Sequence, residues 1–357
     1  MTVRSFTSAV AEPYDRGQEF GRVHAERIAE TVARYAQVFR ALAGRPVRLE
    51  DHGSTALARI DGWAPALGSE IRGIAEGSGV PAELIAAVNA RTEILAAESA
   101  PVRGECSTVV ALGRDQETEP LAAQNWDWFG ALADCWLVWT IPHPDGRVTC
   151  TLTEYGIVGK IGCNDRGVGV LFNILHHQRD GGPIGVPVHV VARQALDTAT
   201  NVAEALLTLG TASLSASTTM TVVGGVAAGK TAVSAELYPD GIGHVLPSTD
   251  GLLIHTNHFL SEPARFGDTE PRSAPDTIVR YEVLRRALNS RVDSLDEKEI
   301  GAALSSHVGG TGAVCCHPDP ARPADLQYAT LATAWLDLAA GRVHATVGGP
   351  CAAASTA

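Results

Sequence analysis

The sequence predicts a layered α+β fold in which helices cover mainly antiparallel strands. Two observations lead to this prediction. The first hundred residues carry apolar side chains at helical spacing, and the chain after Cys106 consists largely of short strand-like segments separated by Gly, Asn and Asp turns. Helices grouped on the faces of closely spaced strands are typical of this class. The pattern changes at Cys106, which divides the chain into residues 1–105 and residues 106–357.

Helices are expected throughout the first hundred residues. Apolar side chains recur at helical intervals over residues 20–42, and Gly44 stands where that helix would end. Further helical stretches cover residues 70–75 and, after a proline that favours a helix start, residues 82–97. This part of the chain is therefore predicted to be entirely helical.

Strands dominate the prediction after Cys106. β-branched and apolar residues gather there in short runs bounded by turn residues. The expected strands cover residues 107–112, 137–141, 148–155, 158–161, 167–175, 217–223 and 231–237. Two helical stretches interrupt them, over residues 187–209 and 274–288.

The composition fits a globular protein with a buried core. Hydrophobic residues make up 45% of the 357 residues and charged residues 19%, which excludes a disordered or collagen-like chain. The 40 acidic residues outnumber the 28 basic ones and no basic run exists, so nucleic acid and anionic membranes are not expected partners. No apolar stretch has the length of a signal-peptide core or a membrane span, which predicts a cytoplasmic protein. The sequence leaves open whether the chain forms a homo-oligomer.

The cysteines do not suggest disulfides or a metal centre. There are seven, an odd number in a chain without a secretory signal, which argues against a disulfide framework. No CxxC pair or Cys/His cluster has the linear spacing of a zinc site, and the neighbouring histidines at 176–177 and 255/258 lack a third ligand. We therefore expect no metal and no cofactor.

One cysteine stands in a more informative context. The motif Gly104-Glu105-Cys106-Ser107-Thr108 places a thiol at the entry to a predicted strand, and Gln124-Asn125-Trp126-Asp127-Trp128 follows it. A lone cysteine is usually inert packing, because free Cys is among the most buried residue types. The neighbouring motifs are what make Cys106 a candidate nucleophile.

Taken together, these motifs resemble the acyl-coenzyme A:6-aminopenicillanate acyltransferase family, which comprises self-processing amide hydrolases and acyltransferases of the N-terminal-nucleophile class. Other motifs occur along the chain in the family's order. Three precede Cys106: Pro13-Tyr14-Asp15-Arg16-Gly17, Gly73-Ile74-Ala75-Glu76-Gly77 and Asn89-Ala90-Arg91-Thr92-Glu93-Ile94. After it come Asn164-Asp165-Arg166-Gly167 through Asn173, then His255-Thr256-Asn257-His258-Phe259, and finally Arg280. The resemblance implies a four-layer αββα fold with two packed, mainly antiparallel sheets.

The resemblance also implies a precursor that cuts itself between Glu105 and Cys106. The products would be a helical pro-segment, residues 1–105, and a catalytic chain, residues 106–357, which remain associated as one structural unit. A thiol can take over the acyl group of the amide before it, and water can hydrolyse the resulting thioester. The new α-amino group, with a pKa of about 7.7–8.0, can then serve as base for a thiol of pKa about 8.5. Glu105 stands where the resemblance leads us to expect glycine, and a bulkier acidic residue there can slow cleavage.

Roles for other residues are implied by matching position. Asp127 would hold and polarise the α-amino group of Cys106, or else cap a strand end. Asn257 would donate to the oxyanion, an interaction of about 3–4 kcal/mol, or else serve as a turn residue. Asn173, or the backbone N–H after it, would supply a second donor. Arg280 would fix Asp127 or the new terminus through a forked ion pair, or else lie exposed on a helix.

Aromatic residues crowd the stretch after Cys106. Trp126 and Trp128, with Gln124, lie on the segment expected beside the nucleophile. They are interpreted either as core or as walls of an apolar acyl pocket, because small-molecule sites are mostly apolar.

The expected function is an N-terminal-cysteine amidase or N-acyltransferase. Cys106 would attack a small N-acyl or aminoacyl amide, form a thioester, and pass the acyl group to water or an amine. Two alternatives remain open. One is an unprocessed cysteine amidase that pairs Cys106 with His255 or His258, and the other is a catalytically silent binding protein of the same fold.

Overall fold

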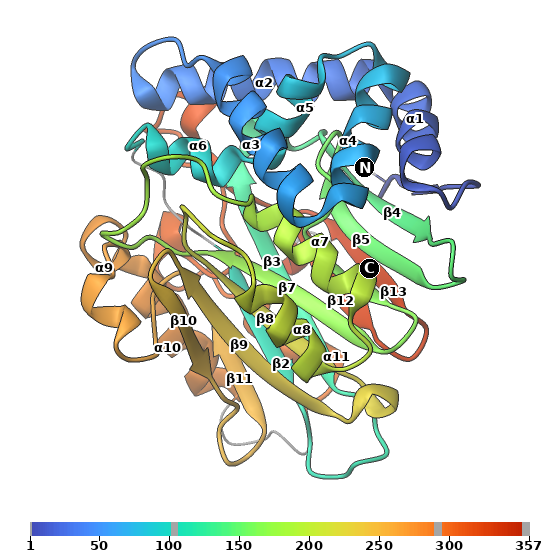
Figure 1. The fold of residues 1–357 in the computed structure, drawn as a ribbon. Coiled ribbons are helices and arrows are strands. Elements are labelled where there is room, and N and C mark those ends of the chain that lie inside the picture. The colour runs from blue at the N-terminus through green and yellow to red at the C-terminus, as the bar shows by residue number, and fades with distance from the viewer. Residues whose placement is uncertain (1, 101–105, 289–294, 352–357) are drawn as a thin grey trace.

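Two β-sheets form the centre of the molecule. The computed structural model describes residues 2–100, 106–288 and 295–351, and the sheets are given for those residues (Figure 1). The larger sheet runs β1 (Ser5–Thr7), β4 (Trp136–Pro142), β5 (Val148–Glu154), β6 (Ile161–Asn164), β7 (Val168–Ile174), β8 (Thr218–Gly224), β9 (Thr231–Tyr238), β10 (Gly241–Val245). The smaller runs β11 (Leu252–His255), β2 (Ser107–Ala111), β3 (Leu121–Phe129), β12 (Tyr328–Asp337), β13 (Arg342–Val347). Among these pairs only β1–β4 is parallel, so both sheets are mainly antiparallel.

The sheets pack face to face and helices cover their outer faces. β2 contacts β7, and β12 and β13 contact β6, across the interface between the sheets. α7 (Val188–Thr198) and α8 (Val202–Gly210) lie on the larger sheet, while α10 (Asp276–Leu288) and α11 (Glu297–Leu304) lie on the smaller one. The predicted four-layer αββα arrangement is thereby confirmed.

The N-terminal helices lie together at one end of the sandwich, at the top of Figure 1. They are α1 (Pro13–Val23), α2 (Ala25–Ala43), α3 (Leu49–Trp63), α4 (Pro65–Ser78), α5 (Ala82–Asn89) and α6 (Arg91–Ala97). The helix predicted over residues 20–42 is in fact two helices that meet at His24, and α2 ends as expected at Gly44, whose φ is 65°. The prediction that this part is entirely helical is wrong for β1, a strand of three residues that is too short to show a periodic pattern.

Four glycines bring α1 and α4 into backbone contact. A Cβ at Gly17 would clash with the carbonyl oxygen of Glu70, and one at Gly73 with that of Tyr14. A Cβ at Gly21 or at Gly77 would likewise clash with the backbone of the other helix. Glycine is therefore required at these helix positions by the close approach of the two backbones.

Other boundaries differ from the prediction for local reasons. The strand expected at residues 158–161 begins only at Ile161, because the Val158 N–H donates to Asn89 instead of to a neighbouring strand. The helix expected over residues 187–209 is divided into α7 and α8, and the Asn201 side chain caps the second by accepting from the Glu204 N–H. β3 was not predicted as a strand, because it lacks a run of β-branched residues and carries Gln124, Asn125 and Asp127 in its middle.

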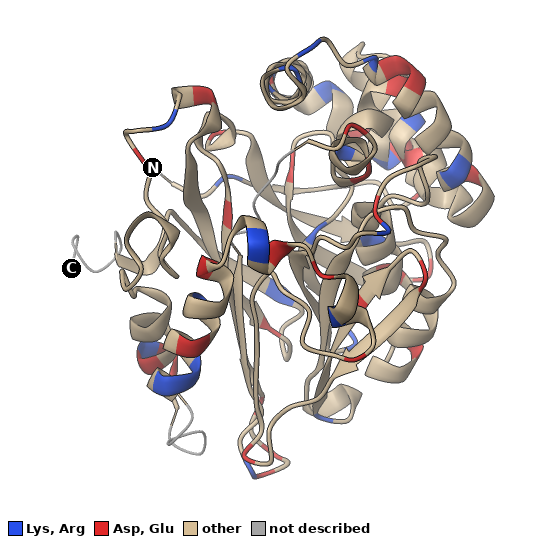
Figure 2. Cartoon of the chain, turned by 90° about the vertical axis from the view of Figure 1, so that its left-hand side faces the viewer, with Lys and Arg blue, Asp and Glu red and all other residues tan. Residues whose placement is uncertain are grey.

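Charged residues of both signs are interspersed over the surface elements (Figure 2). Of the helices in the described part of the chain, none combines the length and apolar character needed to cross a bilayer.

Candidate active site

Cys106 lies immediately before β2, the strand between β11 and β3. Its side chain is buried, and its Sγ lies 3.9 Å from the carbonyl oxygen of Asp127 on β3. The Cys106 carbonyl oxygen accepts a hydrogen bond from Arg280 Nη1 at 2.9 Å. The fold thus brings together three residues that the sequence singled out separately. Glu105, the other side of the predicted cleavage point, lies outside the described residues.

Arg280 braces the site from α10. It is fully buried, so the alternative of an exposed helix arginine is wrong. Besides the Cys106 carbonyl, it donates to Ser107 Oγ at 3.2 Å and to Asn257 Oδ1 at 3.1 Å. Its Nε lies 3.6 Å from Asp276 Oδ2. Its guanidinium therefore joins the nucleophile's backbone to the predicted oxyanion donor.

The two predicted oxyanion donors lie near the ends of strands that belong to different sheets. Asn257, just after β11, donates from Nδ2 to the Ile174 carbonyl oxygen at 2.8 Å. Asn173, on β7, accepts from Thr108 Oγ1 at 2.7 Å and donates to the His255 carbonyl oxygen at 3.4 Å. In the intact chain both amides are thus held by backbone carbonyls, close to the end of β7.

Burial keeps the Cys106 thiol protonated in the intact chain. Burial and, to a smaller extent, the neighbouring charge of Asp127 raise the pKa of Cys106 to about 11, although Lys160 and Arg280 oppose the shift. A thiol with this pKa is a weak nucleophile at neutral pH, because the thiolate is the reactive form. Attack by Cys106 therefore requires a base that accepts its proton.

A buried group of charges includes Lys160, a candidate base that the sequence analysis did not consider. Lys160 Nζ lies 2.9 Å from Glu154 Oε2 and 3.4 Å from the ring centroid of Trp126. Arg91 lies 3.5 Å from the same carboxylate. Burial lowers the pKa of Lys160 to about 7; Arg91 also lowers it, whereas Glu154 and Cys106 raise it. No sequence signal marks Lys160, since its partners come from α6 and β5 and its burial arises only on folding.

The aromatic residues of β3 are packed in the interior. Trp126 and Trp128 are each about 1% exposed, and Gln124 exchanges two hydrogen bonds with the backbone of Phe172 on the other sheet. Trp126 lies beneath Lys160. In the intact chain these residues are core, and their place in a substrate pocket stays a prediction.

The two histidines of the alternative mechanism are engaged elsewhere. His255 Nε2 lies 2.8 Å from Glu236 Oε1, and Nδ1 lies 2.9 Å from the Thr256 carbonyl oxygen. Burial lowers the pKa of His258 to about 4, and its Nδ1 lies 3.1 Å from Thr277 Oγ1. These contacts disfavour a histidine as the base for Cys106.

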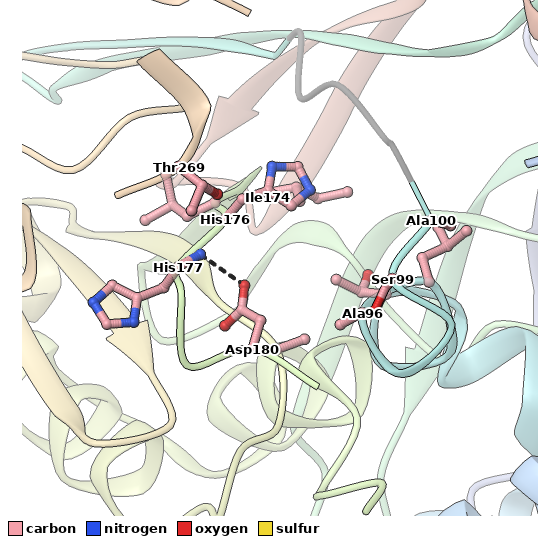
Figure 3. Close-up of a pocket in the computed structure, with 12 residues that line it drawn as sticks. Ala96, Ser99, Ala100, Ile174, His176, His177, Asp180 and Thr269 are labelled. Carbon is pink, nitrogen blue, oxygen red and sulfur yellow. Dashed lines mark hydrogen bonds between the residues drawn. The ribbon is translucent and has the colours of Figure 1, made fainter. Parts of the chain in front are cut away.

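A cavity of about 220 Å³ lies between the C-terminal end of α6 with the residues just after it and the end of β7 (Figure 3). Ala96, Ser99 and Ala100 line one side, and Ile174, whose carbonyl binds Asn257, lines another. His176 gives the cavity a polar end. Desolvation alone would lower the pKa of His176, but the carboxylate of Glu270 raises it overall. The cavity therefore offers mixed apolar and polar walls beside the predicted oxyanion donors.

A second group of polar side chains forms separately from Cys106. Among the described residues, His307, Cys315, His317 and Cys351 gather within ligand distance of one another. The sequence analysis considered only linear spacing and missed this set, although Cys315-Cys316-His317 was a visible signal.

Comparison with known proteins gives a family match. A sequence model described as acyl-coenzyme A:6-aminopenicillanic acid acyl-transferase matches residues 114–351. The match includes Asp127, Asn173, Asn257 and Arg280, and it begins after Cys106. Among curated proteins, the chain is 33% identical over 191 residues to the acyl-coenzyme A:6-aminopenicillanic-acid-acyltransferase 40 kDa form of Emericella nidulans, covering 54% of this chain and 51% of the relative. The chain therefore spans about half the length of the curated relative it matches.

Two solved structures are also similar. An N-acylethanolamine-hydrolyzing acid amidase ortholog from Caenorhabditis elegans shares 15% identity with a TM-score of 0.45, covering 66% of this chain and 93% of that one. Penicillin V acylase from Agrobacterium tumefaciens shares 14% identity with a TM-score of 0.42, covering 68% of this chain and 83% of that one.

Proposed function

The chain belongs to the acyl-coenzyme A:6-aminopenicillanic acid acyl-transferase family, and on that premise we propose that it is a self-cleaving amide hydrolase or acyltransferase with Cys106 as nucleophile. The observation that carries the proposal is the environment of Cys106. It is buried just before β2, next to Asp127, with its carbonyl held by Arg280, and the charge of Lys160 acts to lower the pKa of its thiol.

Self-cleavage begins with the thiol of Cys106. Sγ attacks the carbonyl carbon of residue 105 while Lys160 accepts the thiol proton. The C–N bond then breaks as that proton passes to the leaving nitrogen, which gives a thioester and a free α-amine. Water then hydrolyses the thioester, which leaves a carboxylate on residue 105 and restores the thiol. Lys160 is suited to the first step because its lowered pKa, about 7, leaves a large neutral fraction at neutral pH.

After cleavage the α-amino group of Cys106 takes over as base. Asp127 holds that group, and Arg280 orients Asn257 toward the reacting carbonyl through the 3.1 Å contact with its Oδ1. The Asn257 amide exchanges the Ile174 carbonyl for the oxyanion of the substrate, in the region of the cavity. The acyl group leaves the thioester to water or to an amine.

The cavity is the proposed site for one side of the amide. Its volume, about 220 Å³, suits a small group, and His176 and Asp180 at its wall can bind a polar substituent. Substrates are therefore expected to be small N-acyl or aminoacyl amides with a compact group on one side of the scissile bond. Trp126, Trp128 and Gln124 lie on β3 together with Asp127, and their packing holds this strand in place.

Intact mass under denaturing conditions tests the proposal. Wild-type protein should give two species whose masses sum to the precursor plus one water, with the smaller ending at Glu105. The Cys106→Ala variant should remain a single species. An uncut wild-type chain that hydrolyses amides would favour the unprocessed cysteine amidase. An uncut and inactive chain whose Cys106 resists thiol reagents would favour the silent binding protein.

A further inference from the structure

Four side chains outside the Cys106 site converge on one point. His307 and His317 approach each other with an Nε2–Nε2 separation of 3.0 Å, and the Sγ atoms of Cys315 and Cys351 lie 3.3 Å apart. His317 Nε2 lies 3.8 Å from the first sulfur and 3.5 Å from the second. All four ligand atoms lie within 4.8 Å of one another.

These separations fit one tetrahedral metal ion. Zn–S bonds of about 2.3 Å and Zn–N bonds of about 2.0–2.1 Å place tetrahedral ligand atoms about 3.3–3.8 Å apart. The four separations given above, 3.0, 3.3, 3.5 and 3.8 Å, lie at or near this range, and those between His307 and the two sulfurs are within 4.8 Å, so small shifts of the side chains would seat the ion. Two thiolates and two imidazoles favour zinc over magnesium or calcium. Because all four ligand atoms lie within 4.8 Å of one another, they suit a single ion better than a two-iron cluster, whose ligands are divided between the two irons. We propose that His307, Cys315, His317 and Cys351 form a structural Zn²⁺ site.

The protonation balance of the site is simple. Zn²⁺ displaces one proton from each thiol, and the two protons leave to solvent. The two thiolates then cancel the charge of the ion, and the imidazoles bind as neutral ligands. Four protein ligands leave no open position for water, which is the coordination of a structural site rather than a catalytic one.

A disulfide is the competing use of the two cysteines. A disulfide needs an S–S bond of about 2.05 Å, and the observed Sγ–Sγ separation is 3.3 Å. A disulfide would also leave His307 and His317 in contact with no shared ligand. Zinc accounts for all four side chains at once.

The position of the site suggests what the metal does. Cys351 follows β13, whereas Cys315 and His317 belong to the segment after α11. That segment is attached to the smaller sheet, because Asn125 Nδ2 donates to the Val314 carbonyl oxygen at 2.8 Å and the Cys316 N–H donates to Thr330 Oγ1 at 2.9 Å. Thr330 is the β12 residue paired with Asp127. The metal would therefore fasten the chain after β13 to the segment that packs beside the Asp127 end of β3.

Metal content of the full-length protein tests the proposal directly. Protein purified under reducing conditions, incubated with zinc sulfate and dialysed, should retain one zinc ion per chain. His307→Ala and Cys351→Ser should each lose most of that zinc. His344→Ala, an exposed histidine on β13, and Cys316→Ser, the neighbouring cysteine outside the set, are matched controls that should retain it.

A second measurement does not depend on any variant folding. Wild-type protein loaded with Co²⁺ should show the intense visible bands of tetrahedral cobalt with thiolate ligands, and added Zn²⁺ should abolish them. A chelator should also lower the Tm of the wild-type protein. The proposal is overturned if wild-type protein retains no zinc, if Co²⁺ gives only the weak spectrum of an octahedral ion, or if Cys315 and Cys351 are found as a disulfide in the reduced preparation.

Discussion

The pH dependence of self-cleavage gives a direct test of the base assigned to Cys106. The thiol has its pKa raised to about 11, and the Lys160 ammonium has its pKa lowered to about 7. If Lys160 accepts the thiol proton during attack, the cleavage rate follows the neutral fraction of Lys160. If instead the thiolate forms first and without help, the rate follows the thiolate fraction.

The two cases predict very different changes of the cleavage rate with pH. With a pKa of about 7, the neutral fraction of Lys160 is about 1% at pH 5, about 50% at pH 7 and about 99% at pH 9. The rate should therefore rise about 50-fold from pH 5 to 7 and only about twofold from pH 7 to 9. A thiolate with a pKa of about 11 would instead give about a tenfold rise per pH unit throughout this range.

Precursor from short cell-free translation, diluted into buffers between pH 5 and 9, allows cleavage to be followed by the appearance of the two chains. Lys160→Met should slow cleavage by about 10²-fold or more and remove the plateau. Lys160→Arg keeps the positive charge beside Glu154 but cannot become neutral, so it separates loss of the base from loss of folding. Lys230→Met is the control, because that ammonium binds the Asp115 carbonyl instead. A continued tenfold rise per unit above pH 7, or wild-type behaviour of Lys160→Arg, would refute the assignment.

Three further predictions follow from named contacts. Asn257→Ala should lower kcat for amide hydrolysis by about 10²–10³-fold, measured on processed enzyme, since it removes an oxyanion donor; an unchanged kcat would remove Asn257 from the mechanism. Ala96→Phe should fill part of the cavity and, in steady-state kinetics, raise KM more than it lowers kcat. If the variant and the wild-type enzyme have equal KM values, the substrate binds elsewhere. Gly17→Ala should destabilise the fold by about 1–3 kcal/mol in urea unfolding, because its Cβ meets the Glu70 carbonyl, whereas Gly62→Ala, with open space around it, should stabilise by up to about 1 kcal/mol.

Elements with a clear local pattern of apolar residues could be predicted from the sequence. Elements whose polar residues are satisfied only by distant partners could not. β5, β7, β8 and β9 were found within a few residues, because runs of β-branched residues mark buried strands. β3 carries Gln124, Asn125 and Asp127 among tryptophans, which looks unlike a strand until their partners are known. Asn125, for example, binds carbonyls of Leu304 and Val314, almost two hundred residues away.

The same distinction applies to the residues of the candidate site. Cys106, Asp127, Asn257 and Arg280 were singled out because short motifs carry a family resemblance, and the fold places Cys106, Asp127 and Arg280 together. Their roles stay predictions. Lys160 was missed because a single lysine acquires its chemistry only from burial. The cluster of His307, Cys315, His317 and Cys351 was missed because linear spacing says nothing of a ligand contributed from beyond β13.

The motifs before Cys106 have a physical explanation that does not involve catalysis. Arg16 of α1 and Arg193 of α7 both bind Glu70 of α4, and all three are buried. Asn89 donates to the Gly156 carbonyl oxygen and accepts from the Val158 N–H, each within 2.9 Å.

Glu93 likewise accepts from the Val188 N–H, at the start of α7, at 2.8 Å. The Arg16–Glu70 pair lies within the N-terminal helices, and each of the other contacts joins residues before the proposed cut to residues after it. None of them uses the bond between Glu105 and Cys106. Removing one partner of a buried contact of this kind costs about 1–3 kcal/mol, and more where charges are paired. Hydrolysis of that single bond leaves all of these contacts in place. The two chains are therefore expected to remain associated, with the N-terminal helices as a permanent part of the processed protein.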